Sequence, residues 1–157
     1  MQGRVPSNFD ELDVLSEVYE FLPNSTTCRP SPEQISLKQN TLTVLEKEWV
    51  TVYDYICAVV FGCQTWYTVD GRRQSTRSIT GLKRFQPSLF PYQIRSGYHY
   101  VMWYGSSDKP SEQSITQDIS NSIKEIIGPE APFSFGWYEN PKMSVPEVCH
   151  YQVFWDV

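Results

Sequence analysis

The sequence has few of the residues on which catalytic and metal sites depend. It contains two histidines, His99 and His150, and four cysteines, none of which forms a C-x-x-C pair. Metal sites need three or four ligands, so no metal is predicted, and the cysteines are expected to be reduced thiols. Glycine-rich phosphate loops and the motifs of serine hydrolases and zinc proteases are also missing. No cofactor is therefore expected.

Long apolar runs and a positive net charge are missing as well. The longest apolar run, YICAVVFGC at 55–63, is too short to span a bilayer, and residues 1–14 hold no apolar signal core. These absences predict an intracellular protein without a membrane span. The net charge of −5 gives no strong nucleic-acid signature, because phosphate binding needs clustered Lys and Arg.

Aromatic residues, in contrast, are abundant at 15% of the 157 residues. This length suits a single domain over 1–157, and the aromatic content predicts a rigid core or contact surface. Residues 1–62 are expected to be mainly helical, and residues 85–157 to form a sheet.

Helical periodicity dominates the first part of the chain. Residues 7–23 are predicted to be a helix capped by Ser7 or Asn8, and Ser31 to cap a second helix start. Residues 41–62 are ambiguous, because β-branched residues favour a strand whereas apolar residues recur at helical spacing. We predict one helix there.

Strand patterns dominate the second part. Residues 66–85 indicate a loop or irregular hairpin that turns at Asp70 and Gly71, and residues 86–97 indicate turns. The further expected elements are strand 98–104, helix 111–127 and strands 133–139 and 147–157. This order predicts an α+β fold: N-terminal helices followed by a small mixed, mainly antiparallel sheet with one crossover helix. The crossover is long enough for a parallel βαβ unit, and a hairpin can join the last two strands.

The two histidines fall on strands predicted for the same sheet. Alternation places His99 on one face with Val101 and Trp103, and His150 on one face with Gln152. On neighbouring strands the two imidazoles would approach each other, as an acid–base pair requires. A buried histidine with both nitrogens bonded to the protein is the structural alternative for each.

Basic residues crowd the predicted hairpin and its continuation. Arg72, Arg73 and Arg77 are candidates for an anion-binding site, and a solvated loop is the alternative interpretation.

Two segments, FPYQIRSGYHYVMW (90–103) and WYENPKMSVPEVCHYQVFW (137–155), resemble a domain-of-unknown-function family. The family is typified by fungal N-acetylglucosamine-induced proteins and has relatives in large DNA viruses. The positions that carry the resemblance are Pro91, Tyr92, His99, Trp103, Asn140, Pro141, Ser144, Pro146 and His150. The family often has His-x-His in the last strand, whereas this chain has Gln152 at the second position. Because Gln does not titrate near neutral pH, this departure weakens any acid–base or metal site that the resemblance implies.

Two functions follow as expectations. One is a noncatalytic binding or structural protein that contacts other proteins within a larger assembly. The resemblance implies a minor, capsid-associated component of a large DNA virus particle, located in the host cytoplasm or the virion. The alternative is a small-molecule enzyme or sensor for an amino sugar or sugar phosphate, with a pocket formed by His99, Trp103, Asn140 and His150.

Overall fold

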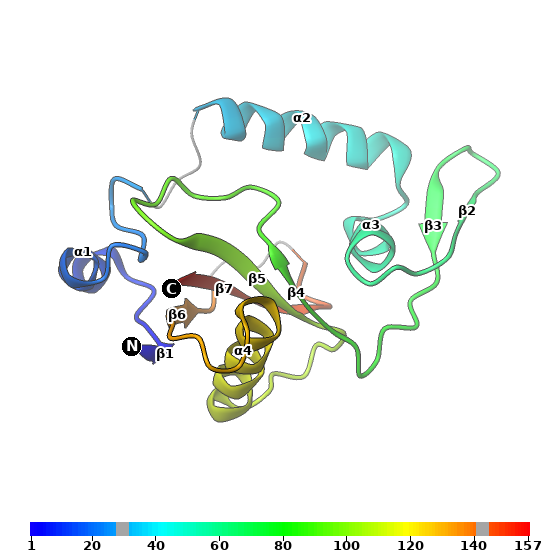
Figure 1. Ribbon diagram of the computed structural model, residues 1–157. Coiled ribbons are helices and arrows are strands. Elements are labelled where there is room, and N and C mark those ends of the chain that lie inside the picture. The colour runs from blue at the N-terminus through cyan, green and yellow to red at the C-terminus, as the bar shows by residue number, and fades with distance from the viewer. Residues whose placement is uncertain (28–31, 141–144) are drawn as a thin grey trace.

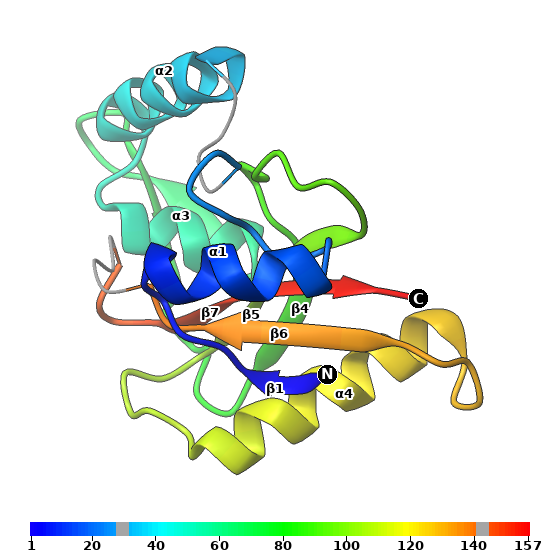
Figure 2. The same ribbon diagram turned by 90° about the vertical axis from the view of Figure 1, so that its left-hand side faces the viewer.

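A computed structural model describes residues 1–27, 32–140 and 145–157. Its central feature is a five-stranded mixed sheet with helices on both faces (Figures 1 and 2). In spatial order the strands are β1 (Gln2–Arg4), β6 (Ser134–Tyr138), β7 (Cys149–Asp156), β5 (Tyr98–Tyr104) and β4 (Lys83–Pro87). The helices are α1 (Phe9–Val18), α2 (Pro32–Glu48), α3 (Val52–Val59) and α4 (Glu112–Ile127). The α+β class is thus confirmed. The predicted Ser31 cap, and Pro141 and Ser144 of the resemblance, lie outside the described residues.

The predicted order of helices before strands is only partly correct. β1 precedes every helix and pairs in parallel with β6, and β4 occupies part of the region predicted as loop and turns. Both lie at the edges of the sheet. An edge strand is formed through backbone pairing with one neighbour, so its side chains need not alternate between apolar and polar residues.

The connection from β5 through α4 to β6 is a split crossover. β5 and β6 each run antiparallel to β7, which lies between them, so they are parallel to each other without pairing. The hairpin predicted for the last two strands is confirmed by the β6–β7 register, in which Phe135 faces Trp155.

The predicted single helix over 41–62 is wrong, because the chain forms two helices there. α2 ends at Glu48, and α3 begins after Thr51, whose hydroxyl accepts the backbone N–H of Asp54 at 3.1 Å. Between them, Val50 donates its N–H to the carbonyl of Arg73 at 2.9 Å. The break therefore arises from pairing with a distant strand.

A separate two-stranded sheet projects beside α3 (Figure 1). It comprises β2 (Thr65–Tyr67) and β3 (Arg73–Ser75), so the predicted hairpin is confirmed. Gly71 has φ +83° in its turn, a conformation that glycine adopts without strain.

The two faces of the main sheet are covered by different helices. Figures 1 and 2 show α4 on one face and α1, α2 and α3 on the other. The first face is a dense core in which Ile115, Ile119 and Ile123 pack against aromatic residues of the strands. The second face contains two smaller apolar clusters, one near α3 and one near α1.

Candidate functional site: a cavity beneath α2

A cavity of about 340 Å³ lies on the second face of the sheet. β5 contributes His99, Val101 and Trp103 to its floor, and β7 contributes His150 and Gln152. In the ladder Trp103 is opposite His150, and Val101 is opposite Gln152. Because alternate side chains of a strand share one face, the register of two strands places all five groups on the same side.

The walls come from parts of the chain that are distant from those strands. α2 supplies Leu42 and Leu45, and α3 supplies Val52 and Ile56. Further lining residues come from segment 88–92 and from Asn140 and Val145. The four residues predicted to share a pocket, His99, Trp103, Asn140 and His150, all line this cavity.

α2 covers the cavity without packing closely against the sheet. Among its described side chains Leu45 alone is buried, whereas Ile35, Leu37, Leu42 and Val44 are exposed. A helix of a globular protein normally buries its apolar face against the core. The cavity is therefore space that the side chains of α2 leave unfilled.

His99 has both ring nitrogens bonded to the protein. The backbone N–H of Tyr92 donates to Nδ1 at 3.0 Å, so the proton of the neutral ring lies on Nε2. Nε2–H in turn donates to Oε1 of Gln152 at 2.5 Å. The ring also stacks on Phe154, with centroids 4.4 Å apart. Burial lowers the pKa of His99 to about 4, although the Gln152 bond partly opposes this shift. His99 is a neutral, fixed part of the floor.

The bond to His99 also fixes the orientation of the Gln152 amide. Oε1 is the accepting atom, because the Nε2 of His99 must donate. The Gln152 NH₂ group remains as a donor, and the side chain is partly exposed in the cavity. Gln152, which stands where the family that the sequence resembles often has a second histidine, therefore presents an amide donor to the cavity.

His150 differs from His99 because it retains an open nitrogen. Its Nδ1–H donates to the carbonyl of Val148 at 3.1 Å, and the ring stacks on Trp103 with centroids 4.8 Å apart. Burial lowers the pKa of His150, so the ring is neutral and Nε2 carries a lone pair. Among the residues that the structure describes, no group donates to Nε2. His150 is 7% exposed and lines the cavity, so Nε2 is an acceptor available to a ligand.

The two imidazoles share the cavity but do not form a pair. His99 is opposite Phe154 and His150 is opposite Trp103, four positions further along the ladder. At about 3.3 Å per residue this separates the two positions by about 13 Å. Each ring stacks on the residue opposite it in the ladder and so stays near its own position, and no proton passes directly between the two rings.

The structure does not bring the three candidate arginines together around a common site. Arg72 pairs with Asp70 at 2.8 Å, and Arg77 pairs with Asp54 at 3.2 Å. The guanidinium of Arg73 lies over the Trp49 ring, 4.6 Å from its centroid. Each guanidinium thus has a partner within the protein, and the anion site stays a prediction.

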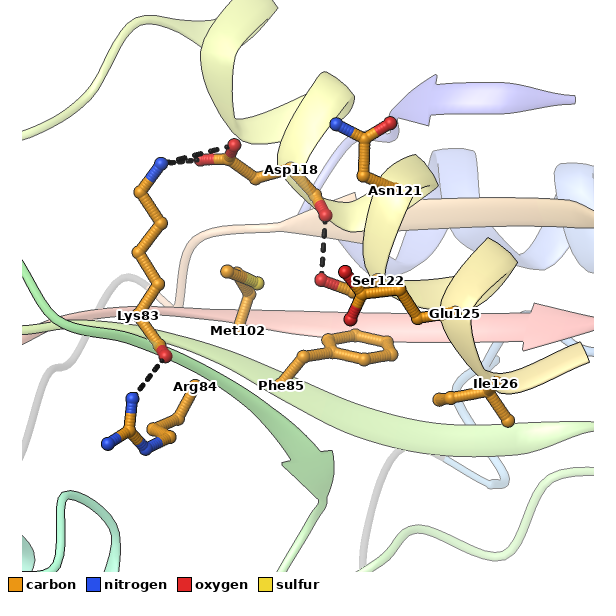
Figure 3. A pocket seen from close by; sticks show the side chains of 9 residues that line it. All are labelled: Lys83, Arg84, Phe85, Met102, Asp118, Asn121, Ser122, Glu125 and Ile126. Carbon is orange, nitrogen blue, oxygen red and sulfur yellow. Dashed lines mark hydrogen bonds and ion pairs between the residues drawn. The ribbon is translucent and has the colours of Figure 1, made fainter. Parts of the chain in front are cut away.

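A second cavity, of about 570 Å³, lies on the opposite face between β4 and α4 (Figure 3). Figure 3 shows Lys83 reaching the carboxylate of Asp118, with which it forms an ion pair at 3.2 Å. Asp118 also accepts the hydroxyl of Tyr104 at 2.9 Å. Two of the four described ionic residues that line this cavity, Lys83 and Asp118, are therefore already paired with each other, whereas the cavity beneath α2 retains an open acceptor and donor. We take the cavity beneath α2 as the candidate site.

Sequence reasoning identified much of the floor but missed the walls. The sequence of segment 88–92 predicts turns, and no pattern in it predicts that the Tyr92 N–H donates to a histidine. The Pro91–Tyr92 step of the family resemblance was the one available signal. Lys38 was also missed, because its position depends on how α2 lies over the sheet.

Searches for metal sites and membrane spans among the described residues give no candidates. No three His, Cys, Asp or Glu side chains of that part of the chain converge as metal ligands. None of its helices is long and apolar enough to cross a membrane.

Comparison with protein-family models, curated proteins and solved structures finds no match. The family resemblance therefore stays a prediction, and the function is argued from the site alone.

Proposed function

We propose that this is a noncatalytic binding protein that holds a small, largely apolar ligand beneath α2. The observation that carries the proposal is the combination of an unfilled apolar cavity with two fixed polar groups in its floor. Small-molecule sites are commonly concave, mostly apolar and provided with a few oriented polar groups. A volume of about 340 Å³ is at the lower end of their usual range.

Binding without turnover is favoured by the state of the histidines. Catalysis by an acid–base pair needs two groups that exchange protons with the substrate. His99 has no free nitrogen, and the described lining contains neither a carboxylate nor a cysteine. Cys149 packs in the core on the other face of the sheet, and its pKa is raised by burial.

The alternative of an enzyme or sensor for an amino sugar or sugar phosphate is less well supported. A sugar presents many hydroxyl groups, whereas the described walls are mainly aliphatic and aromatic. A phosphate would meet Lys38 as the one charged group among the described lining residues. The capsid-associated role and the location in host cytoplasm or virion stay predictions, because no feature of the site bears on them.

The proposal is tested by filling each cavity in turn. Leu42 lines the cavity beneath α2 and is 39% exposed, so Leu42→Trp can enter the space without breaking the core. Ile126→Trp is the matched control, because Ile126 is 51% exposed and lines the cavity of Figure 3. Naphthalene serves as the probe, with saturation-transfer NMR and the Trp103 indole resonance as readouts.

We expect naphthalene to bind wild-type protein and Ile126→Trp, and to shift the Trp103 resonance in both. Leu42→Trp should lose this binding while it keeps the circular dichroism spectrum of the wild type. Equal binding to all three proteins, or none to any of them, would overturn the proposal.

A further inference from the structure

We infer that the ligand is an uncharged, planar compound that presents an N–H donor beside a C=O acceptor, such as a lactam or amide-bearing heterocycle. This inference rests on the proposed function and adds the chemical class of the ligand. It follows from the hydrogen-bonding state of the floor, which is fixed by the backbone groups of Tyr92 and Val148.

The polar atoms of the floor have fixed roles as donors or acceptors. The Tyr92 N–H sets the tautomer of His99, and His99 in turn sets the orientation of the Gln152 amide. The Val148 carbonyl sets the tautomer of His150 in the same way. The floor therefore presents the NH₂ of Gln152 as a donor and Nε2 of His150 as an acceptor. A complementary ligand supplies the opposite groups, a carbonyl oxygen and an N–H.

The floor of the cavity carries no ionised group. Both imidazoles are neutral, and the described lining contains no carboxylate. Lys38 is exposed at the edge, where its ammonium lies over the Phe90 ring, 5.9 Å from the centroid. A charged ligand at the floor would lose its hydration without gaining an ionic partner, which is strongly unfavourable. An uncharged ligand avoids this loss.

The walls of the cavity suit a flat ligand. The floor is aromatic, because the Trp103 ring and the His150 ring stack with an interplanar angle of 26°. Aliphatic side chains of α2 and α3, including Leu45 and Ile56, face this floor across the cavity. A flat, polarisable ring system packs favourably against aromatic and aliphatic walls of this kind.

The experiment compares compounds that have nearly the same shape. 2-Quinolone has the outline of naphthalene with an adjacent N–H and C=O, and 2-naphthoate carries a negative charge on the same outline. 1-Methyl-2-quinolone lacks the N–H, and 4-methyl-2-quinolone keeps it at equal size. Each is titrated by NMR against the wild type at pH 7.

We expect 2-quinolone and its 4-methyl derivative to bind about tenfold more tightly than naphthalene, as one or two net hydrogen bonds provide. The 1-methyl derivative should lose this gain, and 2-naphthoate should bind more weakly than naphthalene. Equal affinity of the two methyl isomers, or preferential binding of 2-naphthoate, would overturn the inference.

Two variants locate the preference in the floor. His150→Phe keeps a ring to stack on Trp103 but removes the acceptor. Gln152→Glu keeps an oxygen to accept from His99 but removes the donor. Each should weaken the binding of 2-quinolone more than that of naphthalene, so that the preference for 2-quinolone falls about tenfold. If naphthalene binds but no variant changes the preference, the proposed function stands and the ligand class is wrong. If no compound binds, both fail.

Discussion

On the α4 side of the sheet, Ile115, Ile119 and Ile123 lie against a layer of aromatic side chains and are almost fully buried. On the α2 side, a helix of similar length buries Leu45 alone among its described side chains. The two helices thus cover opposite faces of one sheet with very different packing. The difference is visible in their sequences, because α4 concentrates isoleucines in one stripe whereas the apolar residues of α2 are scattered.

The polar residues are distributed in a corresponding way. On the second face, His99, His150 and Gln152 stand where an apolar residue would normally fill the space under a helix. Buried polar groups reduce stability unless they are hydrogen-bonded, and the structure bonds three of the four imidazole nitrogens. Apolar burial is therefore concentrated on the α4 side, and the open polar groups are concentrated beneath α2.

The largest expected contrast comes from truncating one residue on each side. Ile119→Ala removes a fully buried side chain and should lower the free energy of unfolding by about 2–5 kcal/mol. Leu42→Ala trims a half-exposed side chain above an existing cavity and should change it by less than about 1 kcal/mol. Urea denaturation of both variants measures the difference. Equal losses would show that α2 is packed as firmly as α4.

The second contrast concerns a polar anchor that replaces apolar packing near α3. Asp54 is fully buried and accepts hydrogen bonds from the Thr51 hydroxyl, the Ser75 N–H and Arg77. Asp54→Ala leaves these donors without a partner and should lower the free energy of unfolding by about 3 kcal/mol. Asp70→Ala is the control, because the bonds of Asp70 to Arg72 and Thr68 lie on the exposed hairpin and their loss should cost far less stability than the loss of the Asp54 bonds.

The pH dependence of stability should also show the contribution of Asp54. Burial raises the pKa of Asp54, but the bonds from Arg77, Thr51 and Ser75 outweigh it and hold the pKa below its ordinary value of 3.8. The contribution of Asp54 is thus complete above that value and is lost as pH falls below it. Wild-type stability measured below pH 4 should fall more steeply than that of Asp54→Ala. Parallel curves would contradict the assignment.

The strongly periodic elements were predictable from the sequence. β5 matches its predicted bounds, and α4 begins after the predicted cap Ser111 and ends before Gly128. Both elements bury a regular pattern of apolar residues, and burial is what such patterns encode. The floor of the cavity followed from the same alternation, which placed His99 with Trp103 and His150 with Gln152.

The remaining features depend on contacts between distant segments. Residues 49–51 leave the helical conformation because β3 accepts the Val50 N–H, and no residue pattern there marks this pairing. The tautomer of His99 depends on the Tyr92 N–H in a loop. Arg73 and Arg77 looked available because their partners, Trp49 and Asp54, lie earlier in the chain and outside the hairpin. A cluster of arginines is visible in the sequence, whereas the partners of those arginines are known only from the fold.

The pH dependence of stability also tests whether His99 is a fixed, neutral part of the floor beneath α2. Because His99 has a pKa of about 4 in the folded protein and an ordinary value of 6.5, the unfolded chain takes up a proton first. Its stabilising contribution is therefore complete above pH 6.5 and falls by about 3 kcal/mol as pH drops to 4. His99→Gln should flatten this part of the stability curve, and NMR should show His99 titrating near 4. A midpoint near 6.5 would show that the ring is hydrated, and the fixed floor would then be wrong.

The smallest contrast lies within the α4 side and tests how complete its packing is. Trp137 and Trp155 are both 2% exposed, and the Trp137 Nε1–H donates to the Thr116 hydroxyl at 2.9 Å. Among the described residues, Trp155 Nε1 is the one buried side-chain nitrogen or oxygen without a partner. Replacement by Phe removes similar volume at both positions, but it breaks a bond at Trp137 and removes an unpaired donor at Trp155. Trp155→Phe should therefore lower the free energy of unfolding by about 1–2 kcal/mol less than Trp137→Phe, as measured by urea denaturation. A larger loss of unfolding free energy for Trp155→Phe would mean that ring packing outweighs the cost of the unpaired donor. The unpaired Nε1–H would then have no measurable effect on stability on the α4 side of the sheet.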